Sequence, residues 1–85
     1  MISIPMIDMA ATGRTIAGLR RASGLSVRQL QDILGFSTPQ AIYKWQRGDC
    51  LPTLDNIVVL STAFGVSIED ILVVRERIHP MTDAA

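Results

Sequence analysis

The stretch SVRQLQDILGFSTPQAIYKWQRG, residues 26–48, contains the signals that decide the fold. Ser26, followed three residues later by Gln29, forms a capping-box pattern that predicts the start of a helix, and Gly35 suits the end of that helix. A second helix is predicted over residues 38–47. Because the connector that begins at Gly35 is too short for anything but a tight turn, we expect a helix-turn-helix arrangement.

The second of these helices has well-defined ends and two different sides. Thr38 is expected to cap it, Pro39 suits its first turn, and Gly48 suits its end. Ile42 and Trp45 share one side and are predicted to belong to the core. The remaining side is polar and basic and carries Tyr43, Lys44 and Arg47.

Three further helices are predicted outside this stretch, each preceded by a capping residue: Thr12, Thr53 and Ser67. The first of them covers residues 12–23. Apolar residues recur at helical spacing in the first of these helices (Ile16, Leu19 and Ala22), and the last carries Ile68, Ile71 and Leu72. In the helix between them, the residues that we expect to face inward are Leu54, Ile57, Val58, Leu60, Ala63 and Phe64. Five short helices predict a compact all-α bundle that needs no strand for its core.

Two terminal segments lie outside the helical pattern. Residues 1–11 form an apolar arm with loose alternation, and residues 71–78 are rich in β-branched side chains. The two segments could pair as a small sheet or extend a dimer contact. We expect residues 12–74 to form the helix-turn-helix domain and residues 75–85 a C-terminal tail, and residues 79–85 are equally consistent with disorder.

Composition and charge limit the class of protein. The 85 residues are 48% hydrophobic and 19% charged, which is typical of one small globular domain. The net charge is zero, but it is unevenly distributed. Residues 12–50 contain six basic and two acidic side chains, a net charge of +4, whereas residues 51–85 contain two basic and five acidic ones, a net charge of −3. The basic half includes the helix-turn-helix stretch.

Several other classes of protein are disfavoured. A single cysteine, Cys50, excludes an internal disulfide and cannot by itself form a zinc site, which favours a reducing, cytoplasmic setting. No apolar run approaches the roughly 20 residues that a membrane span requires. General acid–base catalysis uses a histidine or paired carboxylates in a pocket, and the chain has one isolated histidine, His79. We therefore expect no enzyme activity, no cofactor and no metal.

Residues 14–73 resemble the phage-repressor (Cro/C1, or xenobiotic-response-element) type of helix-turn-helix domain. The order and spacing of many residues carry the resemblance: Arg20, Gly24-Leu25-Ser26, Leu30, Leu34-Gly35, Ile42, Trp45, Arg47-Gly48, Pro52, Leu60 and Phe64-Gly65-Val66-Ser67. The resemblance implies that the helix over residues 38–47 lies in the major groove of double-stranded DNA.

The resemblance also implies which residues bind DNA. The groove-facing set is Thr38, Gln40, Tyr43 and Lys44, and Arg28 and Arg47 suit phosphate contacts. Gln40 has the chemistry to pair bidentately with adenine, which discriminates between bases by about 1–3 kcal/mol. Lys44 suits a guanine or a phosphate, and Tyr43 suits thymine methyl groups or a phosphate.

The chain departs from the family pattern at four places. Val27 replaces the usual glutamine at the first residue of the first helix of the motif, and Gln31 replaces a small residue. Gln46 replaces an acid, which weakens a possible ion pair with an arginine of the first predicted helix, Arg20. The connector is one residue longer than usual, and the larger Gln31 could compensate for the longer turn.

These observations predict a small sequence-specific DNA-binding protein that regulates transcription, most simply as a repressor that blocks a promoter. We expect a homodimer formed through the fifth helix and the terminal segments. Its two recognition helices would enter successive major grooves about 34 Å apart. The alternative is a protein-interaction module on the same fold, such as an antitoxin or accessory subunit, which the apolar N-terminal arm and the zero net charge favour.

Overall fold

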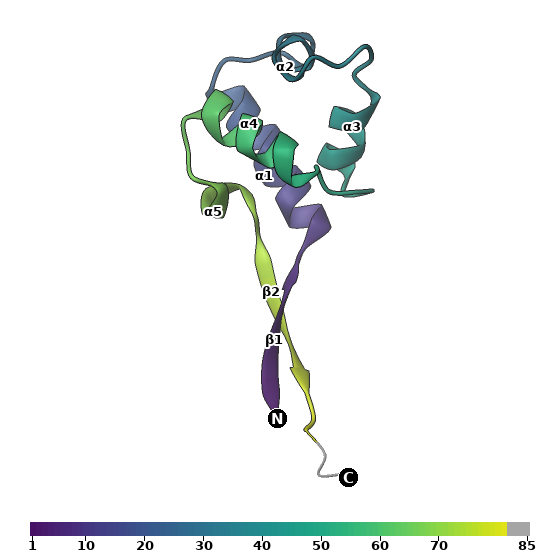
Figure 1. The fold of residues 1–85 in the computed structure, drawn as a ribbon, viewed down its shortest axis with the longest axis vertical. Coiled ribbons are helices and arrows are strands. Elements are labelled where there is room, and N and C mark those ends of the chain that lie inside the picture. The colour runs from purple at the N-terminus through teal and green to yellow at the C-terminus, as the bar shows by residue number, and fades with distance from the viewer. Residues whose placement is uncertain (82–85) are drawn as a thin grey trace.

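The structure is a computed structural model that describes residues 1–81 (Figure 1). Within this range five helices lie between two strands, and the elements are, in order, β1 (Ile2–Ile7), α1 (Met9–Ala22), α2 (Val27–Leu34), α3 (Gln40–Arg47), α4 (Leu54–Phe64), α5 (Ile68–Ile71) and β2 (Val74–His79). The five predicted helices are confirmed. The all-α class is wrong in one respect, because β1 and β2 pair as an antiparallel sheet. Residues 82–85 of the predicted tail lie outside the described residues.

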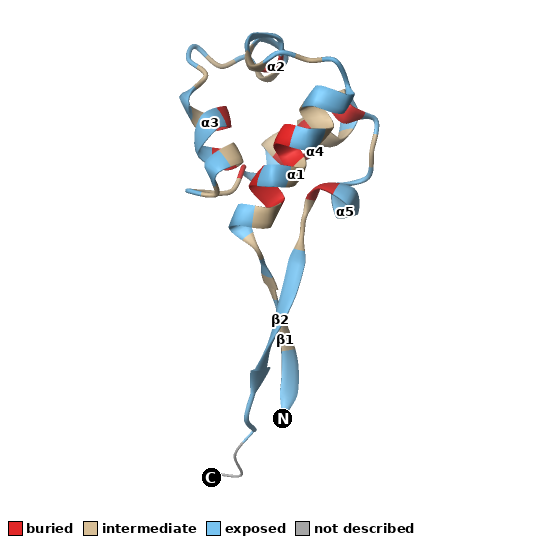
Figure 2. Ribbon diagram, turned by 180° about the vertical axis from the view of Figure 1, so that it is seen from behind, coloured by how far each residue is buried: buried red, intermediate tan, exposed pale blue. Residues whose placement is uncertain are grey.

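Every helix contributes to one small core, which occupies the helical part of the molecule (Figure 2). The buried apolar residues that form it are Ile16 from α1, Leu30 from α2, Ile42 and Trp45 from α3, Ile57, Leu60 and Phe64 from α4, and Ile71 from α5. The prediction that Ile42 and Trp45 belong to the core is confirmed. Since both residues of α3 that are buried lie on one side, the other side of this helix is free.

Two residues of α4 were assigned to the wrong side of the helix. Leu54 is 83% exposed and Val58 is 54% exposed, although both were predicted to face inward. The buried residues of α4 are Ile57, Leu60 and Phe64, which share one side because successive residues turn by about 100°. Leu54 and Val58 fall on the neighbouring side, which no other described element covers.

The helix starts agree with the sequence at three of the predicted caps, and one of these is Ser67, the N-cap residue of α5. Ser26 caps α2 with the complete capping box, and Thr53 caps α4. The predicted cap Thr38 is wrong, because α3 begins at Gln40 and its N-cap residue is Pro39, with no side-chain hydrogen bond.

The start of α1 also differs from the prediction. The helix begins at Met9, and Asp8 caps it by accepting a hydrogen bond from the N–H of Ala11 at 2.9 Å. Thr12, the predicted cap, is fully buried, and its hydroxyl oxygen accepts a hydrogen bond from the N–H of Val73 at 3.0 Å. Thr12 therefore joins α1 to the segment that leads into β2.

β1 and β2 form a ribbon that projects from the helices, and it accounts for much of the 53 Å length of the molecule (Figure 1). Of the two arrangements open for the terminal segments, the structure has the small sheet. The register pairs Ile2 with His79 at the free end and Ile7 with Val74 at the base. At the base, the N–H of Asp8 donates to the carbonyl oxygen of Val73 at 2.8 Å, so the ladder continues to the start of α1.

Thr12→Val should lower the free energy of unfolding by about 1–3 kcal/mol. The substitution keeps the volume of the side chain but removes the acceptor of the Val73 N–H, a donor that the structure holds in a part-buried site. Urea denaturation measures the loss, and Thr12→Ser, which retains the hydroxyl, should recover part of it. Equal stabilities of Thr12→Val and the parent would contradict a structural role for this hydrogen bond.

Candidate nucleic-acid interface

The turn between α2 and α3 is braced by a side chain of α2. Gly35 ends α2 with φ of 72°, in the left-handed region that glycine adopts without strain. The Nε2 of Gln31 donates to the carbonyl oxygen of Phe36 at 3.1 Å. Gln31, which is larger than the residue usual at this position in the family, thus satisfies a carbonyl group of the connector.

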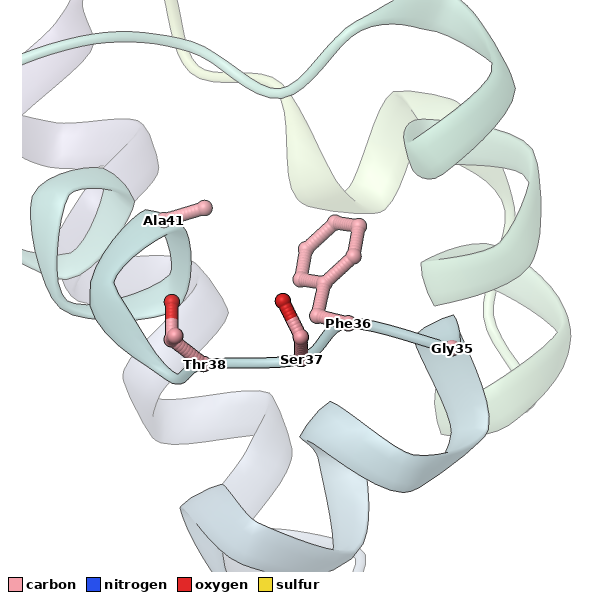
Figure 3. Close-up of a pocket in the computed structure, with 5 residues that line it drawn as sticks. All are labelled: Gly35, Phe36, Ser37, Thr38 and Ala41. Atoms are coloured by element: carbon pink, nitrogen blue, oxygen red, sulfur yellow. The ribbon is translucent and has the colours of Figure 1, made fainter.

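The connector surrounds an open pocket, shown in Figure 3, which is lined by Gly35, Phe36, Ser37, Thr38 and Ala41. The ring of Phe36 points back toward the helices and meets the ring of Trp45 edge-on, with 5.8 Å between the ring centroids. This aromatic pair connects the turn to the buried side of α3. The connector is therefore seated on the core as well as on α2.

α3 packs mainly on α1. Gly13 of α1 lies against the C-terminal part of α3, where a Cβ atom on Gly13 would overlap the carbonyl oxygen of Trp45 and lie 2.9 Å from that of Gln46. At the end of α3, Gly48 has φ of 80°, and a Cβ atom there would lie 2.7 Å from the Cα of Ala10. The two glycines set the distance between α1 and α3. Sequence reasoning missed Gly13, whose only signal is a glycine inside a helical pattern.

A polar contact fixes the same pair of helices. The Nε of Arg20 in α1 donates to Oε1 of Gln46 in α3 at 3.1 Å, and its Nη1 donates to the carbonyl oxygen of Leu25 at 2.8 Å. Arg20 is thus the arginine that faces Gln46, as expected from the family pattern. The interaction is a hydrogen bond to a neutral amide in place of an ion pair.

The free side of α3 brings four of the six predicted DNA-binding residues together. They line one open groove: Gln40, Tyr43, Lys44 and Arg47. We call this set the α3 groove. All four side chains are exposed, including Tyr43 at 44%. Since the opposite side of α3 is buried through Ile42 and Trp45, the helix is held in the bundle with the α3 groove facing outward.

Arg47 is the one member of the α3 groove that already has a charged partner. Its Nε lies 3.0 Å from Oδ2 of Asp49, and this is the only ion pair within residues 1–81. The side chains of Arg47 and Asp49 are 61% and 54% exposed, respectively, so water screens their attraction strongly. The ion pair therefore holds Arg47 only loosely in this orientation.

The structure does not bring the other two predicted residues into the α3 groove. Thr38 lines the pocket at the connector, and its hydroxyl is free of the capping role that the sequence suggested (Figure 3). Arg28 lies in the first turn of α2, where its side chain is exposed. Both residues flank α3, one at its N-terminus and one on the preceding helix.

Other kinds of site find no support within residues 1–81. This part of the chain has no group of three His, Cys, Asp or Glu side chains placed to hold a metal ion. None of the helices there has the length and apolar character needed to cross a membrane.

Comparison with known proteins agrees with the geometry of α2 and α3. A helix-turn-helix family model matches residues 16–71, which begins in α1 and ends with α5. The chain belongs to the Cro/C1-type helix-turn-helix family. No curated protein sequence matches it with significance.

Three solved structures share this Cro/C1-type fold. The restriction-modification controller protein C.AhdI from Aeromonas hydrophila is 28% identical, with a TM-score of 0.67 over 75% of this chain and 96% of that protein. The clp gene regulator ClgR from C. glutamicum is 21% identical, with a TM-score of 0.65 over 74% of this chain and 80% of the other. The DNA-binding domain of BldD from S. venezulae is 20% identical, with a TM-score of 0.64 over 76% and 96% of the two chains.

Proposed function

We propose that this protein binds double-stranded DNA sequence-specifically and regulates transcription, with α3 in the major groove. The observation that carries the proposal is the α3 groove, four adjacent polar side chains on the free side of a helix whose other side is buried. α2 precedes α3 and is joined to it by a short turn. Helix-turn-helix proteins have this arrangement and insert the later of the two helices into the major groove of DNA. Similarity to C.AhdI, a controller protein, supports a regulatory role.

We propose a role for each side chain of the α3 groove from its chemistry. Gln40, near the N-terminus of α3, would pair with an adenine, and Lys44, one turn further along, would bind a guanine or a phosphate. Tyr43 would contact a thymine methyl group or a phosphate. Arg47 would bind a phosphate, and exchanging its partner Asp49 costs little because an exposed ion pair contributes only about 0–1 kcal/mol.

Flanking groups would fix the register of the protein on the duplex. Arg28 in the first turn of α2 and Thr38 beside α3 suit phosphate or base-edge contacts. The N-terminus of α3 has no side-chain cap, so its first N–H groups can donate to a phosphate oxygen. Contacts of this kind position a helix in the groove without reading sequence.

A homodimer would present two copies of α3 to a near-palindromic site, about 34 Å apart. We propose α5 as the dimer contact, since its first residue, Ile68, is 39% exposed. The terminal segments, which we also expected at the dimer contact, pair with each other within one chain. A dimer bound in the cytoplasm at a promoter would block the polymerase and repress transcription.

Two substitutions in the α3 groove test this function. Lys44→Ala should weaken binding and reduce the dependence of log K on log salt by about 0.9 if the lysine binds a phosphate. Gln40→Ala should leave most of the affinity and relax the preference at one base pair. Sites selected from randomised duplex DNA provide the ligand, and fluorescence anisotropy at several salt concentrations provides the affinities.

Arg14→Ala is the matched control for Lys44→Ala, because it removes one positive charge from an exposed position of α1. The control should bind selected DNA nearly as tightly as the parent. If the parent enriches no sequence and its binding does not change with salt, the regulator function is wrong. A protein-interaction module on the same fold would then account for the chain.

A further inference from the structure

Within residues 1–81, the ribbon of β1 and β2 is a two-stranded sheet to which no third strand is added. Each strand pairs only with the other, and all six residues of β2 are exposed (Figure 2). An isolated two-stranded ribbon is at best marginally stable in water, so packing against another surface would stabilise it. The question is which kind of surface its side chains fit.

The register sorts the side chains of the ribbon onto two faces. Directly opposed residues of an antiparallel pair lie on the same face, and neighbours along a strand alternate between faces. One face therefore combines three apolar residues of β1 with two arginines and a histidine of β2: Ile2, Ile4, Met6, Arg75, Arg77 and His79. We call it the basic face. The other face carries Ser3, Pro5, Ile7, Val74, Glu76 and Ile78, so the only acid of the two strands lies away from both arginines.

The edge of β1 is poorly suited to a further strand. The hydrogen bond from Asp8 N–H to Val73 continues the ladder, so the even-numbered residues of β1 direct their backbone groups toward β2. The odd-numbered residues direct theirs to the free edge. Pro5 is one of these, and it lacks the N–H that an added strand would need at the middle of the edge.

The edge of β2 is unsuited to a second copy of the same strand. A two-fold pairing of β2 with its copy, centred on Arg75, Glu76 or Arg77, places identical charges directly opposite each other. Like charges in opposed positions destabilise a sheet. Pro5 weakens strand addition at β1, and like charges oppose these self-pairings of β2, so the faces of the ribbon are the better candidates for binding.

The basic face has the chemistry of a DNA-binding surface. Arg75 and Arg77 take part in no ion pair within the described chain, and they are two residues apart, about 6.6 Å along the strand. Beside them runs the apolar row of β1. Minor-groove proteins combine arginine with apolar side chains such as isoleucine, methionine and proline, and the major groove admits a two-stranded ribbon.

The ribbon begins beside the end of α3 that carries Arg47. Asp8 joins β1 to α1, and Ala10, two residues later, touches Gly48 immediately after α3. The root of the ribbon is thus held next to the C-terminal end of α3 through one close backbone contact, and the ribbon extends away from the helices along the long axis (Figure 1).

We infer that the basic face of the ribbon is a second DNA-binding surface, on which Arg75 and Arg77 bind phosphates beyond the segment that α3 reads. The apolar row of Ile2, Ile4 and Met6 lies against the sugars of the same stretch. This inference rests on the proposed function, since it concerns the same duplex.

Duplex length combined with substitution tests the inference. One duplex contains only the sequence selected by the parent protein, and the other extends it by about one helical turn of random sequence at both ends. The parent should bind the long duplex at least about ten-fold more tightly at 0.1 M salt. Arg75→Gln with Arg77→Gln should abolish this preference and lower the salt slope on the long duplex by about 0.9 for each phosphate that the variant no longer binds.

Two control variants isolate the cause. Arg75→Lys with Arg77→Lys keeps both charges and should retain the preference for the long duplex. Glu76→Gln changes a charge on the opposite face of β2 and should also retain it. All of these side chains are exposed, so the variants should melt like the parent.

Three results would overturn the inference. The first is equal binding of both duplexes by the parent, which leaves the function of the α3 groove intact. The second is an equal loss on both duplexes in the double glutamine variant. The third is dissociation of a parent dimer by the same substitutions in sedimentation equilibrium without DNA, which would make the ribbon a contact between protein chains. Failure of the parent to bind either duplex would overturn the proposed function as well.

Discussion

Gly13→Ala is expected to lower the free energy of unfolding by about 3 kcal/mol, although it adds a single methyl group. The Cβ atom would overlap the carbonyl oxygen of Trp45 and lie 2.9 Å from that of Gln46. Both obstacles are backbone atoms of α3, so no side-chain rotation relieves the overlap. α1 and α3 must move apart, and this movement disrupts the packing of Trp45, which is 3% exposed.

The same helix supplies the matched control. Gly18 is exposed in α1, and a Cβ atom there would have no neighbour within 4 Å. Gly18→Ala should therefore raise the free energy of unfolding by about 0.5–1 kcal/mol, because alanine loses less entropy than glycine in a helix. Urea denaturation of the two variants measures opposite shifts from the parent. Similar stabilities of Gly13→Ala and Gly18→Ala would mean that α1 and α3 are not in close contact.

Gly13→Ala also distinguishes an effect on stability from an effect on the position of α3 in the folded protein. If the protein remains folded under conditions that favour the native state, the displaced α3 should bind selected DNA much more weakly than the parent. Gly18→Ala should bind it unchanged. A folded Gly13→Ala variant with parental affinity would contradict the dependence of the α3 groove on this contact.

The helices of this protein could be predicted because their signals are local. The capping box of Ser26 and Gln29 and the cap at Thr53 operate within one turn, and the structure has both. Glycines in the left-handed region mark the ends of α2, α3 and α4. The start of α1 was misjudged because Asp8 and Thr12 are both chemically able to cap, and only the tertiary contact with Val73 decides between them.

The buried side of a helix is harder to predict when apolar residues occur all round it. In α4 the sequence LDNIVVLSTAF offers more apolar positions than one side can bury, and the pattern alone gave no reason to leave out Leu54 and Val58. α3 posed no such difficulty. It has few apolar residues, so the burial of Ile42 and Trp45 followed from their spacing, as did the free polar side.

The candidate site also combines features that local sequence patterns predict with features that depend on contacts between helices. The shared side of Gln40, Tyr43, Lys44 and Arg47 follows from helical periodicity, which the sequence contains. The positions of Gly13 and Gly48 depend on the approach of α1 to α3, two helices far apart in the chain, and no local pattern reports that distance. The sheet was left open as an alternative, because the pairing of β1 with β2 joins the two ends of the chain.

Gly48→Ala is the second substitution expected to have a large effect, a loss of about 2–5 kcal/mol in the free energy of unfolding. Gly48 has φ of +80°, a backbone conformation that costs a residue with a Cβ atom about 1–2 kcal/mol. The added atom would also lie 2.7 Å from the Cα and 3.1 Å from the N of Ala10. Relief of that overlap requires movement of the first turn of α1, which overpacking data suggest costs about 1–3 kcal/mol more.

Gly35→Ala separates the cost of the left-handed backbone conformation from the cost of the overlap with Ala10. Gly35 ends α2 with φ of +72°, but a Cβ atom there would have no neighbour within 4 Å. This variant should therefore show the backbone cost alone, about 1–2 kcal/mol, in the same urea denaturation experiment. The excess loss in Gly48→Ala measures the close approach of α3 to Ala10, and equal losses in the two variants would contradict it.

Because Ala10 lies just after the root of the ribbon, movement at Gly48 also changes how the ribbon is set relative to α3. Gly48→Ala should consequently reduce the preference for the long duplex, whereas Gly35→Ala, which lies away from that contact, should preserve it.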